Sequence, residues 1–562
     1  SSLGEFSGDD VYRSLDDVRV DLQLMIDDPS RYLDSSIIEV NQTLSISDEM
    51  YGREEEIARL RDAYNRFCDG VCNGALILGE GGVGKSTFAM NAKKFTIAAN
   101  GYFVSGKFDR NATRPFMVIG DVFNSMCDLF AADIQSIEQE RKMAEALTKS
   151  LGRDAFLIAN IVPNLSNLMP LYTSCESSSF DAASRTRYLL LTLLDTLSKL
   201  SKSITILLDD LQWIDPASLT FCRALFQSTK SNKNVFLVLC SRESEVQTQD
   251  KSEVHDWLQS LSGSTLETIH LTNLNPEDVN NLVSDSLRTW PRLTRSLSAI
   301  LHGKSLGNPF FLRQTMEMLC RGGYLHYSLG ERKWKWDLDE ISDLRLDDNV
   351  VSLLTREMTK LPDELLVGLK AASCIGYCIP QTVVDILSKH LEMDLFGVLT
   401  SLVQRSYLAG VGSALYRFTH DRIYQAAYEL MSEKQRREDH MKFGLAICSY
   451  VLDNCENNYD MMFVGVNQIN RGGPEVLADS CRRVMISQLN LNAGKRALLL
   501  TDFSSALSFF GHGIMFLNPG HWDAHYQLSL DLFTSAAESA CATSDAALVK
   551  SYSETILAHS RS

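Results

Sequence analysis

The chain has 562 residues and a formal net charge of −17, and hydrophobic residues make up 45% of it. This acidic balance disfavours a partner held through its phosphate backbone, because such binding requires clustered lysine and arginine. No apolar run reaches the roughly 18 residues of a membrane-spanning helix, so no membrane span is predicted. The length favours two to four domains.

The polar N-terminal segment, residues 1–48, contains one amphipathic stretch, Val18–Ile26, which predicts a short helix followed by a linker. The segment has no signal-peptide pattern and no initiator methionine, so we expect it to be the tail of an upstream domain. The chain has thirteen cysteines, and none of them form a CxxC pair. No histidine cluster accompanies them to complete a zinc set. We therefore expect reduced thiols in a cytoplasmic protein, with neither disulfides nor a zinc site.

Residues 49–270 alternate apolar runs with helical patterns, which predicts an α/β domain with a parallel sheet. The clearest strands are Ala75–Leu78, Ile204–Leu208 and Val235–Cys240. Each is a continuous apolar run, as is typical of central strands covered by helices on both faces.

The segment GEGGVGKS, Gly79–Ser86, follows the first of these strands and opens a helical run, so it matches a P-loop in sequence and in context. Its glycines let backbone N–H groups turn toward an anion, and the helix N-terminus adds partial positive charge. We predict that Lys85 reaches the β- and γ-phosphates and that the hydroxyl of Ser86 binds Mg²⁺. The predicted nucleotide-binding residues of this loop are Gly79, Gly81, Gly82, Val83, Gly84, Lys85, Ser86 and Thr87.

Two carboxylates, Asp209 and Asp210, follow the predicted strand Ile204–Leu208. Side chains at the C-terminal end of a parallel strand face the crevice where ligands bind. We predict that Asp209 holds Mg²⁺ and that Asp210 acts as a general base on the attacking water. Asp215, which precedes a proline, predicts a helix start and no chemistry.

Arg242 stands just past the predicted strand Val235–Cys240. An arginine there can approach the γ-phosphate and stabilise its charge. The alternative is a surface arginine that pairs with Glu243 or Glu245.

The second half of the chain is predicted to be mainly helical. Asn275, followed by a proline and two acidic residues, predicts the start of a helix that opens region 271–345. Region 346–440 combines short helices with a possible β-hairpin at Tyr407–Phe418, a mixture compatible with a winged helix. Region 441–562 is helical throughout and favours stacked helix pairs of the tetratricopeptide kind. Its expected close-packing points are Ala506, Ala536, Ala537 and Ala540.

With these motifs, the chain resembles the STAND class of signal-transduction ATPases within the AAA+ superfamily. It is most similar to the ATPase modules of large sensor proteins that also carry kinase-like and histidine-kinase domains. The opening motif YGREEEIARL implies that Gly52 and Arg53 lie beside the nucleotide. LLDDLQWIDPASL is similar to the Walker B segment of the family, and SRESEV is similar to its sensor segment, which favours the phosphate role of Arg242. The GKFD segment, Gly106–Asp109, also matches the family, without a role that we can assign.

Two later motifs extend the resemblance. SLGNPFFL resembles the lid motif whose proline, here Pro309, packs on adenine, whereas the alternative is a helix break set by Asn308 and Pro309. YRFTHDRIYQAAY resembles the winged-helix segment, which implies that His420 contacts the β-phosphate of ADP, although a lone histidine is more often structural. Glu80 departs from the family, and a carboxylate there is unfavourable near phosphates unless it points outward.

The predicted fold is an α/β P-loop NTPase with a parallel sheet (49–270), followed by a helical lid (271–345), a winged-helix-like domain (346–440) and an α-helical tetratricopeptide-like solenoid (441–562). The predicted function is an ATP-binding, slowly hydrolysing regulatory switch that needs Mg²⁺, is closed with ADP and open with ATP, and meets a protein partner through its helical array. The chain has no histidine-kinase lid, so we do not expect it to be a kinase itself. One alternative is a DNA-associated ATPase of the origin-recognition type, which the 10 basic and 13 acidic residues of region 346–440 disfavour. The other is a degenerate P-loop that serves only as a scaffold.

Overall fold

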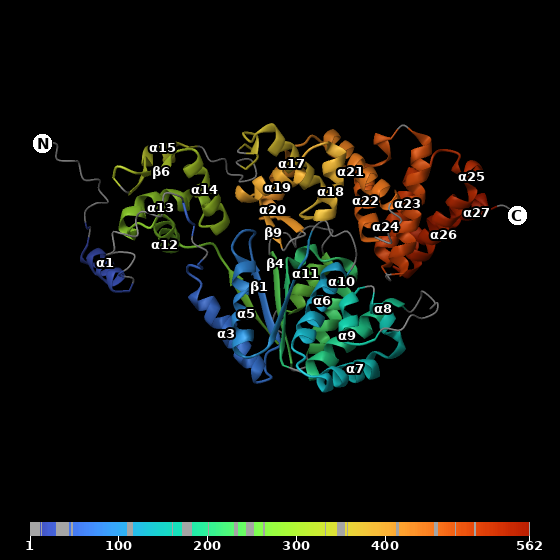
Figure 1. Cartoon of the computed structure of the whole chain (residues 1–562), viewed down its shortest axis with the longest axis horizontal. Helices are drawn as coiled ribbons and strands as arrows, with labels where there is room; N and C mark the ends of the chain where they lie inside the picture. Colours follow the sequence, from blue (N-terminus) through green and yellow to red (C-terminus); the bar gives the residue numbers. More distant parts are fainter. Residues whose placement is uncertain are drawn as a thin grey trace. The chain divides into compact units, whose positions relative to one another are not determined.

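A computed structural model describes most of the chain (Figure 1). The described residues are 12, 14–27, 29, 44–46, 49–109, 116–159, 161–170, 182–200, 202–229, 234–242, 252–261, 265–331, 333–344, 354–356, 358–411, 415–453, 459–477, 479–499, 502–543 and 545–560. The chain forms two compact units that alternate along the sequence. The first comprises Ser1–Phe95, Val238–Asp250 and Ser260–Val350, and the second comprises Thr96–Leu237, Lys251–Gln259 and Val351–Ser562.

A five-stranded sheet stands in the order β2-β3-β4-β1-β5. Its strands are β1 (Gly74–Gly79), β2 (Tyr102–Lys107), β3 (Ile204–Asp209), β4 (Val235–Arg242) and β5 (Leu266–Leu271). The pairs β1–β5 and β2–β3 are parallel, as predicted. Every residue of β3 and β4 is buried, which accounts for their continuous apolar runs. Strands β2 and β5 are partly exposed and have a weaker pattern, which is why the sequence did not single them out.

The helices that accompany this sheet are listed here by their bounds: α3 (Glu54–Cys68), α4 (Lys85–Ala89), α5 (Asn91–Ala98), α6 (Met117–Ala132), α7 (Ile137–Leu151), α8 (Phe156–Ala159), α9 (Ala182–Leu200), α10 (Pro216–Thr229) and α11 (Ser252–Leu261). Short 3₁₀ turns lie at Gly152–Ala155, Pro163–Asn167 and Leu211–Trp213. Helix α10 starts as predicted, because Oδ1 of Asp215 accepts a hydrogen bond from the backbone N of Ser218 at 2.9 Å.

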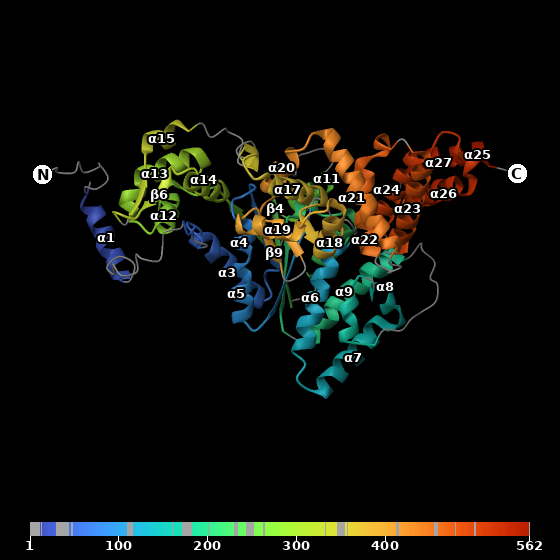
Figure 2. The same cartoon turned by 45° about the horizontal axis from the view of Figure 1, so that its top comes forward.

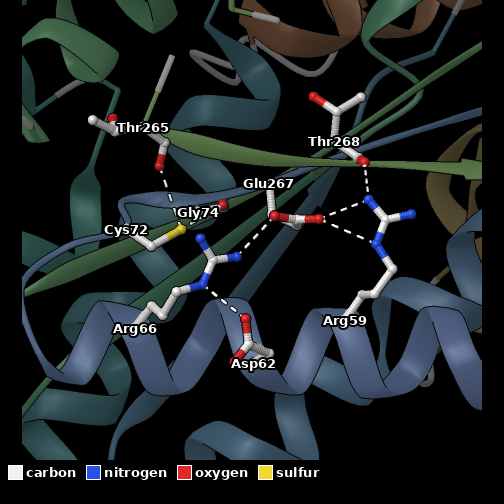
Figure 3. A network of polar contacts seen from close by, with 8 residues as sticks. All are labelled: Arg59, Asp62, Arg66, Cys72, Gly74, Thr265, Glu267 and Thr268. Atoms are coloured by element: carbon white, nitrogen blue, oxygen red, sulfur yellow. Dashed lines mark hydrogen bonds and ion pairs between the residues drawn. The ribbon is translucent and has the colours of Figure 1, made fainter. Parts of the chain in front are cut away.

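Helix α3 is fixed to the edge strand β5 by a network of charged side chains (Figure 3). Glu267 of β5 pairs with Arg59 at 2.7 Å and with Arg66 at 2.8 Å, and Arg59 also donates to the carbonyl oxygen of Thr268. Burial acts to raise the pKa of Glu267, but the hydrogen bonds from the two arginines lower that pKa below its usual value. The network sets the position of α3 and of the motif at its start.

The region after β5 is a small helical subdomain with its own apolar core. It contains α12 (Pro276–Leu287), α13 (Pro291–Ser305), α14 (Pro309–Arg321) and α15 (Leu338–Asp343). Asn275 caps α12 as predicted, accepting from the backbone N of Glu277 and of Asp278 at 2.9 Å each. An antiparallel pair, β6 (Leu325–Ser328) and β7 (Lys333–Trp336), interrupts what the sequence predicted to be a mainly helical region. The alternating Lys-Trp-Lys-Trp of β7 carries a strand pattern that is too short to stand out.

The predicted N-terminal helix is α1 (Leu15–Asp27), and it lies against the same subdomain. Asp21 pairs with Arg292 at 2.8 Å, and Asp17 pairs with Arg295 at 3.0 Å. Both aspartates are almost fully buried, so these ion pairs define how α1 meets α13.

In the second unit, residues after 362 form a compact bundle with a small antiparallel sheet in the order β8-β10-β9. Its elements are α17 (Asp363–Ile375), β8 (Cys378–Pro380), α18 (Gln381–Leu391), α19 (Leu395–Gln404), β9 (Leu408–Val411), β10 (Leu415–Phe418) and α20 (Asp421–Glu429). Strands β9 and β10 form the predicted hairpin. The assignment of this bundle as a winged helix stays a prediction.

A helical array follows, and Figures 1 and 2 show its helices side by side in orange to red. It contains α21 (Glu433–Asp453), α22 (Tyr459–Gly472), α23 (Ser480–Leu499), α24 (Phe503–Phe516), α25 (His521–Ala524), α26 (Tyr526–Ala542) and α27 (Ala546–His559). The pairs α21–α22, α23–α24 and α26–α27 pack together over a shared core. Ala506, Ala536 and Ala540 are fully buried in it as expected, whereas Ala537 is only partly buried. The predicted domain boundary at residue 440 falls inside the continuous helix α21.

A search of the described residues found no helix with both the length and the apolar character needed to cross a membrane.

Candidate functional site

The P-loop joins the end of β1 to the start of α4. Gly82 and Gly84 have φ angles of +87° and +97°, a region that glycine enters without strain. These two residues let the chain reverse tightly, so that the N–H groups of the loop and of the first turn of α4 can converge on an anion. Ser86 and Thr87 are exposed in that first turn, and Val83 is buried beneath the loop.

The ammonium group of Lys85 is held over the P-loop by main-chain carbonyls. Its Nζ donates to the carbonyl oxygen of Gly79 at 2.9 Å and to that of Glu80 at 2.7 Å, and the residue is 6% exposed. The loop itself therefore positions the charge that is predicted to meet the phosphates. The residue Glu80 is exposed, which is the condition under which its carboxylate is tolerated.

The start of α14 is bonded directly to the P-loop. The side chain of Asn308 caps α14 by accepting from the backbone N of Phe310 at 3.2 Å, and its Nδ2 donates to the carbonyl oxygen of Gly81 at 3.0 Å. The backbone N of Phe310 also donates to the carbonyl oxygen of Gly82 at 3.3 Å. A Cβ atom on Gly82 would lie 2.7 Å from Oδ1 of Asn308, so the approach requires glycine.

Asn308 is therefore a site residue that the sequence reasoning missed. The Asn-Pro pair was identified as a helix break, and Pro309 does occupy the first turn of α14. The signal that could have revealed the contact is the asparagine itself, whose amide can cap a helix and still donate to a second loop. The adenine contact of Pro309 remains a prediction.

Arg242, at the end of β4, lies beside the same loop. It is 5% exposed, and a Cβ atom on Gly81 would lie 3.3 Å from its Nη1. This places the guanidinium group next to the predicted phosphate site. Glu243 and Glu245, its alternative partners, lie outside the described residues.

The opening motif is anchored behind the loop. Arg53 is buried, pairs with Glu56 at 3.4 Å and donates to the carbonyl oxygen of Thr272, just after β5. Gly52 lies directly against the carboxylate of Asp278 in α12. These contacts join the motif to β5 and α12, and the nucleotide contact of Gly52 and Arg53 remains a prediction.

The Walker B carboxylates lie at the end of β3 in the second unit, and both are buried. Asp209 Oδ1 accepts from the backbone N of Asp210 at 2.9 Å, and Asp210 Oδ1 accepts from Nε2 of Gln212 at 2.8 Å. Asp210 has a φ angle of +55°, which an aspartate tolerates better than most residues. The turn thus holds two adjacent acidic groups in fixed orientations.

Lys107 of the GKFD segment meets these carboxylates. Its Nζ lies 2.9 Å from Asp210 Oδ2 and 3.7 Å from Asp209 Oδ2. The parallel register of β2 and β3 pairs Lys107 with Asp209, which brings the two strand ends to the same level. Burial acts to lower the pKa of Lys107, but the charges of Asp210 and Asp209 raise that pKa above the usual lysine range.

His420 is the N-cap of α20. Its Nδ1 accepts a hydrogen bond from the backbone N of Arg422 at 3.1 Å. Because Nδ1 is an acceptor, the neutral ring carries its proton on Nε2. The histidine therefore has a structural role here, and its contact with the β-phosphate remains a prediction.

The predicted metal ligands, Ser86 and Asp209, offer a hydroxyl and a carboxylate oxygen. These are the hard donors that Mg²⁺ prefers, so they fit the ion that accompanies a nucleotide. Within the described part of the chain, no group of three or more His, Cys, Asp or Glu side chains is gathered as a metal site of its own.

Comparison with known proteins agrees with this geometry. A family model described as the AAA ATPase domain matches residues 49–238. Residues 49–238 are therefore similar to an AAA ATPase domain. The matched range contains the P-loop and the Walker B pair, and Arg242 lies just beyond it.

A curated relative extends beyond the AAA ATPase domain. Hybrid signal transduction histidine kinase G of Dictyostelium discoideum is 22% identical over 623 aligned positions, which cover 88% of this chain. The chain spans only 18% of the length of that relative. Together with the family match, this confirms the predicted resemblance to ATPase modules of signal-transduction proteins.

Two solved structures are also similar to the chain, at lower sequence identity. A STAND protein with a tetratricopeptide repeat sensor from Pyrococcus horikoshii is 12% identical, with a TM-score of 0.42 over 93% of this chain and 73% of its own. Cdc6p from Pyrobaculum aerophilum is 11% identical, with a TM-score of 0.31 over 72% of this chain and 99% of its own.

Proposed function

We propose that the chain is an ATP-binding, slowly hydrolysing switch module of a larger signal-transduction protein, closed with ADP and open with ATP. The observation that carries the proposal is the direct bond between the lid and the phosphate loop, made by Asn308 to Gly81 and by Phe310 to Gly82. A lid bonded to the loop itself must respond when the phosphates bound there change. A ligand shifts such an equilibrium only by binding the two states unequally.

ADP and ATP differ at the γ-phosphate, and Arg242 is the group we assign to that difference. Its guanidinium group lies beside Gly81, the residue whose carbonyl oxygen Asn308 holds. A γ-phosphate that draws Arg242 toward itself would disturb this contact and loosen the lid. His420 would add the opposite preference, because Nε2–H can donate to the β-phosphate of ADP in the closed state.

Hydrolysis would reset the switch. Lys85 would bind the β- and γ-phosphates, Ser86 and Asp209 would hold Mg²⁺, and Asp210 would accept the proton of the attacking water. Mg²⁺ would neutralise phosphate charge in the transition state. An ion pair with Lys107 already occupies the carboxylate of Asp210, which supports a slow rate.

The helical array would bind the partner or relay the signal. Its helices share one apolar core, and α21 joins it to the bundle that carries His420. The chain spans only 18% of its curated relative, and we propose no kinase activity for it.

The first test identifies the nucleotide that copurifies with the chain. After denaturation, chromatography should detect about one ADP per wild-type chain and none in Lys85→Ala. Lys93→Ala, which removes an exposed lysine from α5, is the matched control and should retain ADP. A wild-type chain that is empty and takes up no added Mg·ATP would instead support the scaffold alternative.

The second test addresses the switch itself. Small-angle scattering should give a more compact particle with ADP than with a non-hydrolysable ATP analogue, and the difference should disappear in Lys85→Ala. Identical wild-type profiles would contradict the switch while leaving nucleotide binding intact. Salt-sensitive DNA binding in a mobility-shift assay would favour the origin-recognition alternative.

A further inference from the structure

Lys107 is a charged residue for which neither the family match nor the predicted site provides a role. It ends β2, and the register of β2 with β3 places it opposite Asp209. Its ammonium group lies 2.9 Å from Asp210 and 3.7 Å from Asp209, and so contacts both Walker B carboxylates at once.

The carboxylate pair needs a cation. The side chains of Asp209 and Asp210 are 8% and 11% exposed, and two adjacent buried negative charges are costly unless they are compensated. Gln212 supplies a neutral donor to Asp210 and no charge. The ammonium of Lys107 brings a positive charge to this pair.

The same ammonium has a second favourable neighbour. Its Nζ lies 5.7 Å from the centre of the Tyr377 ring, close enough for a cation–π interaction. Tyr377 precedes β8, and its carbonyl oxygen accepts from the backbone N of Phe418 at 3.0 Å. Its ring packs edge-on against Tyr424 of α20, the helix that His420 caps.

We propose that Lys107 is an exchangeable counter-cation of the Walker B pair. It competes with the divalent ion for the two carboxylates, and its displacement changes its contact with the Tyr377 ring. The proposal rests on the proposed function, since it deepens the regulation of the same site. In the metal-free protein the ammonium neutralises Asp209 and Asp210. A divalent cation on Asp209 repels the ammonium, which then leaves the carboxylates and keeps the Tyr377 ring as its favourable contact.

This exchange has two consequences. The ion pair raises the concentration of metal at which the site fills, because the metal must displace a charge that is already bound. Binding of the metal also changes the contact between Lys107 and the Tyr377 ring. Because that ring packs against Tyr424, the change reaches α20. Lys107 is thus a positioning residue that joins the state of the Walker B pair to the winged-helix-like bundle.

The test measures Mn²⁺ affinity in chains stripped of any copurified nucleotide, by electron paramagnetic resonance of the free ion. Removing the competing charge in Lys107→Met should lower the Mn²⁺ dissociation constant on the order of tenfold, whereas Lys107→Arg should stay near wild type. Lys202→Met is a closely matched control. Lys202 likewise pairs with a carboxylate, Asp133 at 3.1 Å, and lies 5.3 Å from the centre of a tyrosine ring, and its side chain is 35% exposed against 36% for Lys107.

A second variant pair tests the aromatic contact. Tyr377→Leu removes the ring and should change Mn²⁺ affinity less than Lys107→Met does, and it should have no further effect when the two changes are combined. Tyr377→Phe keeps the ring face and should behave as wild type. If Lys107→Met folds poorly, the Mn²⁺ affinities of these Tyr377 variants still test the proposal.

Unchanged or weaker Mn²⁺ binding in Lys107→Met, or an equal gain in Lys202→Met, would overturn the proposal. The titration contains no nucleotide, so its outcome is independent of the ADP measurement. A chain that binds no nucleotide but gains Mn²⁺ affinity in Lys107→Met would refute the switch and retain the ion exchange. A chain that binds ADP but shows no gain of Mn²⁺ affinity in Lys107→Met would refute the ion exchange and leave the proposed switch standing.

Discussion

Two lysines of this chain are held in polar sites, and they are held in opposite ways. Lys85 is bound by main-chain carbonyls five and six residues before it, so the P-loop carries both the charge and its support. Lys107 is bound by carboxylates that reach it from a different strand. A site built from nearby backbone is visible in the sequence as a motif, whereas a site built from distant side chains becomes visible only when the strands are aligned.

The largest effect should come from the Walker B side of this comparison. Asp209→Asn removes a full charge from the predicted metal site, and we expect ATP hydrolysis to fall about 100-fold while ADP still copurifies. Lys85→Ala should instead lose the nucleotide. Asp195→Asn, at an exposed ion pair with Lys199, is the control and should hydrolyse ATP normally. If Asp209→Asn loses ADP as completely as Lys85→Ala does, the two sites do not divide binding from chemistry as proposed.

The same division explains what could be predicted from the sequence. The P-loop, the strands β1, β3 and β4, the caps Asn275 and Asp215 and the β9–β10 hairpin depend on local patterns, and the structure contains them. The contact of Asn308 with Gly81 and that of Lys107 with Asp210 depend on which chain segments meet in space. A local pattern does not identify the partner in either contact, and the GKFD segment stayed without a role until the register of β2 with β3 was known.

A side-chain network around His440, in the same unit as Lys107, should make the stability of the protein depend on pH. His440 is buried, with Nε2 at 2.8 Å from the Tyr428 hydroxyl and Nδ1 at 2.6 Å from Oε1 of Gln468. Burial lowers the pKa of His440 to about 4. The folded protein therefore binds this proton less readily than the unfolded chain, so stability should decrease as the pH falls from about 6.5 toward 4.

We expect the loss in that window to reach about 2–3 kcal/mol, measured by denaturant unfolding at several pH values. His440→Gln keeps hydrogen-bonding groups and cannot take up the proton. Its stability should be lower at pH 7 and flatter across the window. A His440→Gln variant that is as sensitive to pH as wild type would assign the effect to other groups.

A smaller effect is expected from alanine substitutions at the two helix caps of the lid, which should differ in the rate of ADP release. Asn308 and Asn275 both cap helices, but only Asn308 also bonds the P-loop. Each alanine substitution should cost about 1 kcal/mol of stability in thermal unfolding. Only Asn308→Ala should speed ADP release, because only it loosens the lid from Gly81. Equal release rates in the two variants would show that the contact does not hold the nucleotide.

The smallest effect tests whether exposed side-chain networks matter in the first unit. Glu267→Gln removes the charge that Arg59 and Arg66 share, and we expect a loss of about 0.5–1 kcal/mol, since both arginines are partly exposed. The pKa of Glu267 is lowered in the fold, so its contribution is present above the usual glutamate pKa and lost as the pH falls through the lowered value. A variant as stable as wild type at pH 7 would leave α3 held by its apolar face alone.

Helix α21 gives the molecule a mechanical property. It has 21 residues and packs against α17 and α18 as well as against α22, so the bundle and the array share one rod. At a rise of 1.5 Å per residue the rod is about 30 Å long, and a tilt of about 10° at one end moves the other by about 5 Å. A hinge would absorb such a tilt, but a continuous helix acts as a lever arm. A small rotation beside α20 would therefore become a displacement of several ångströms at the far end of α21.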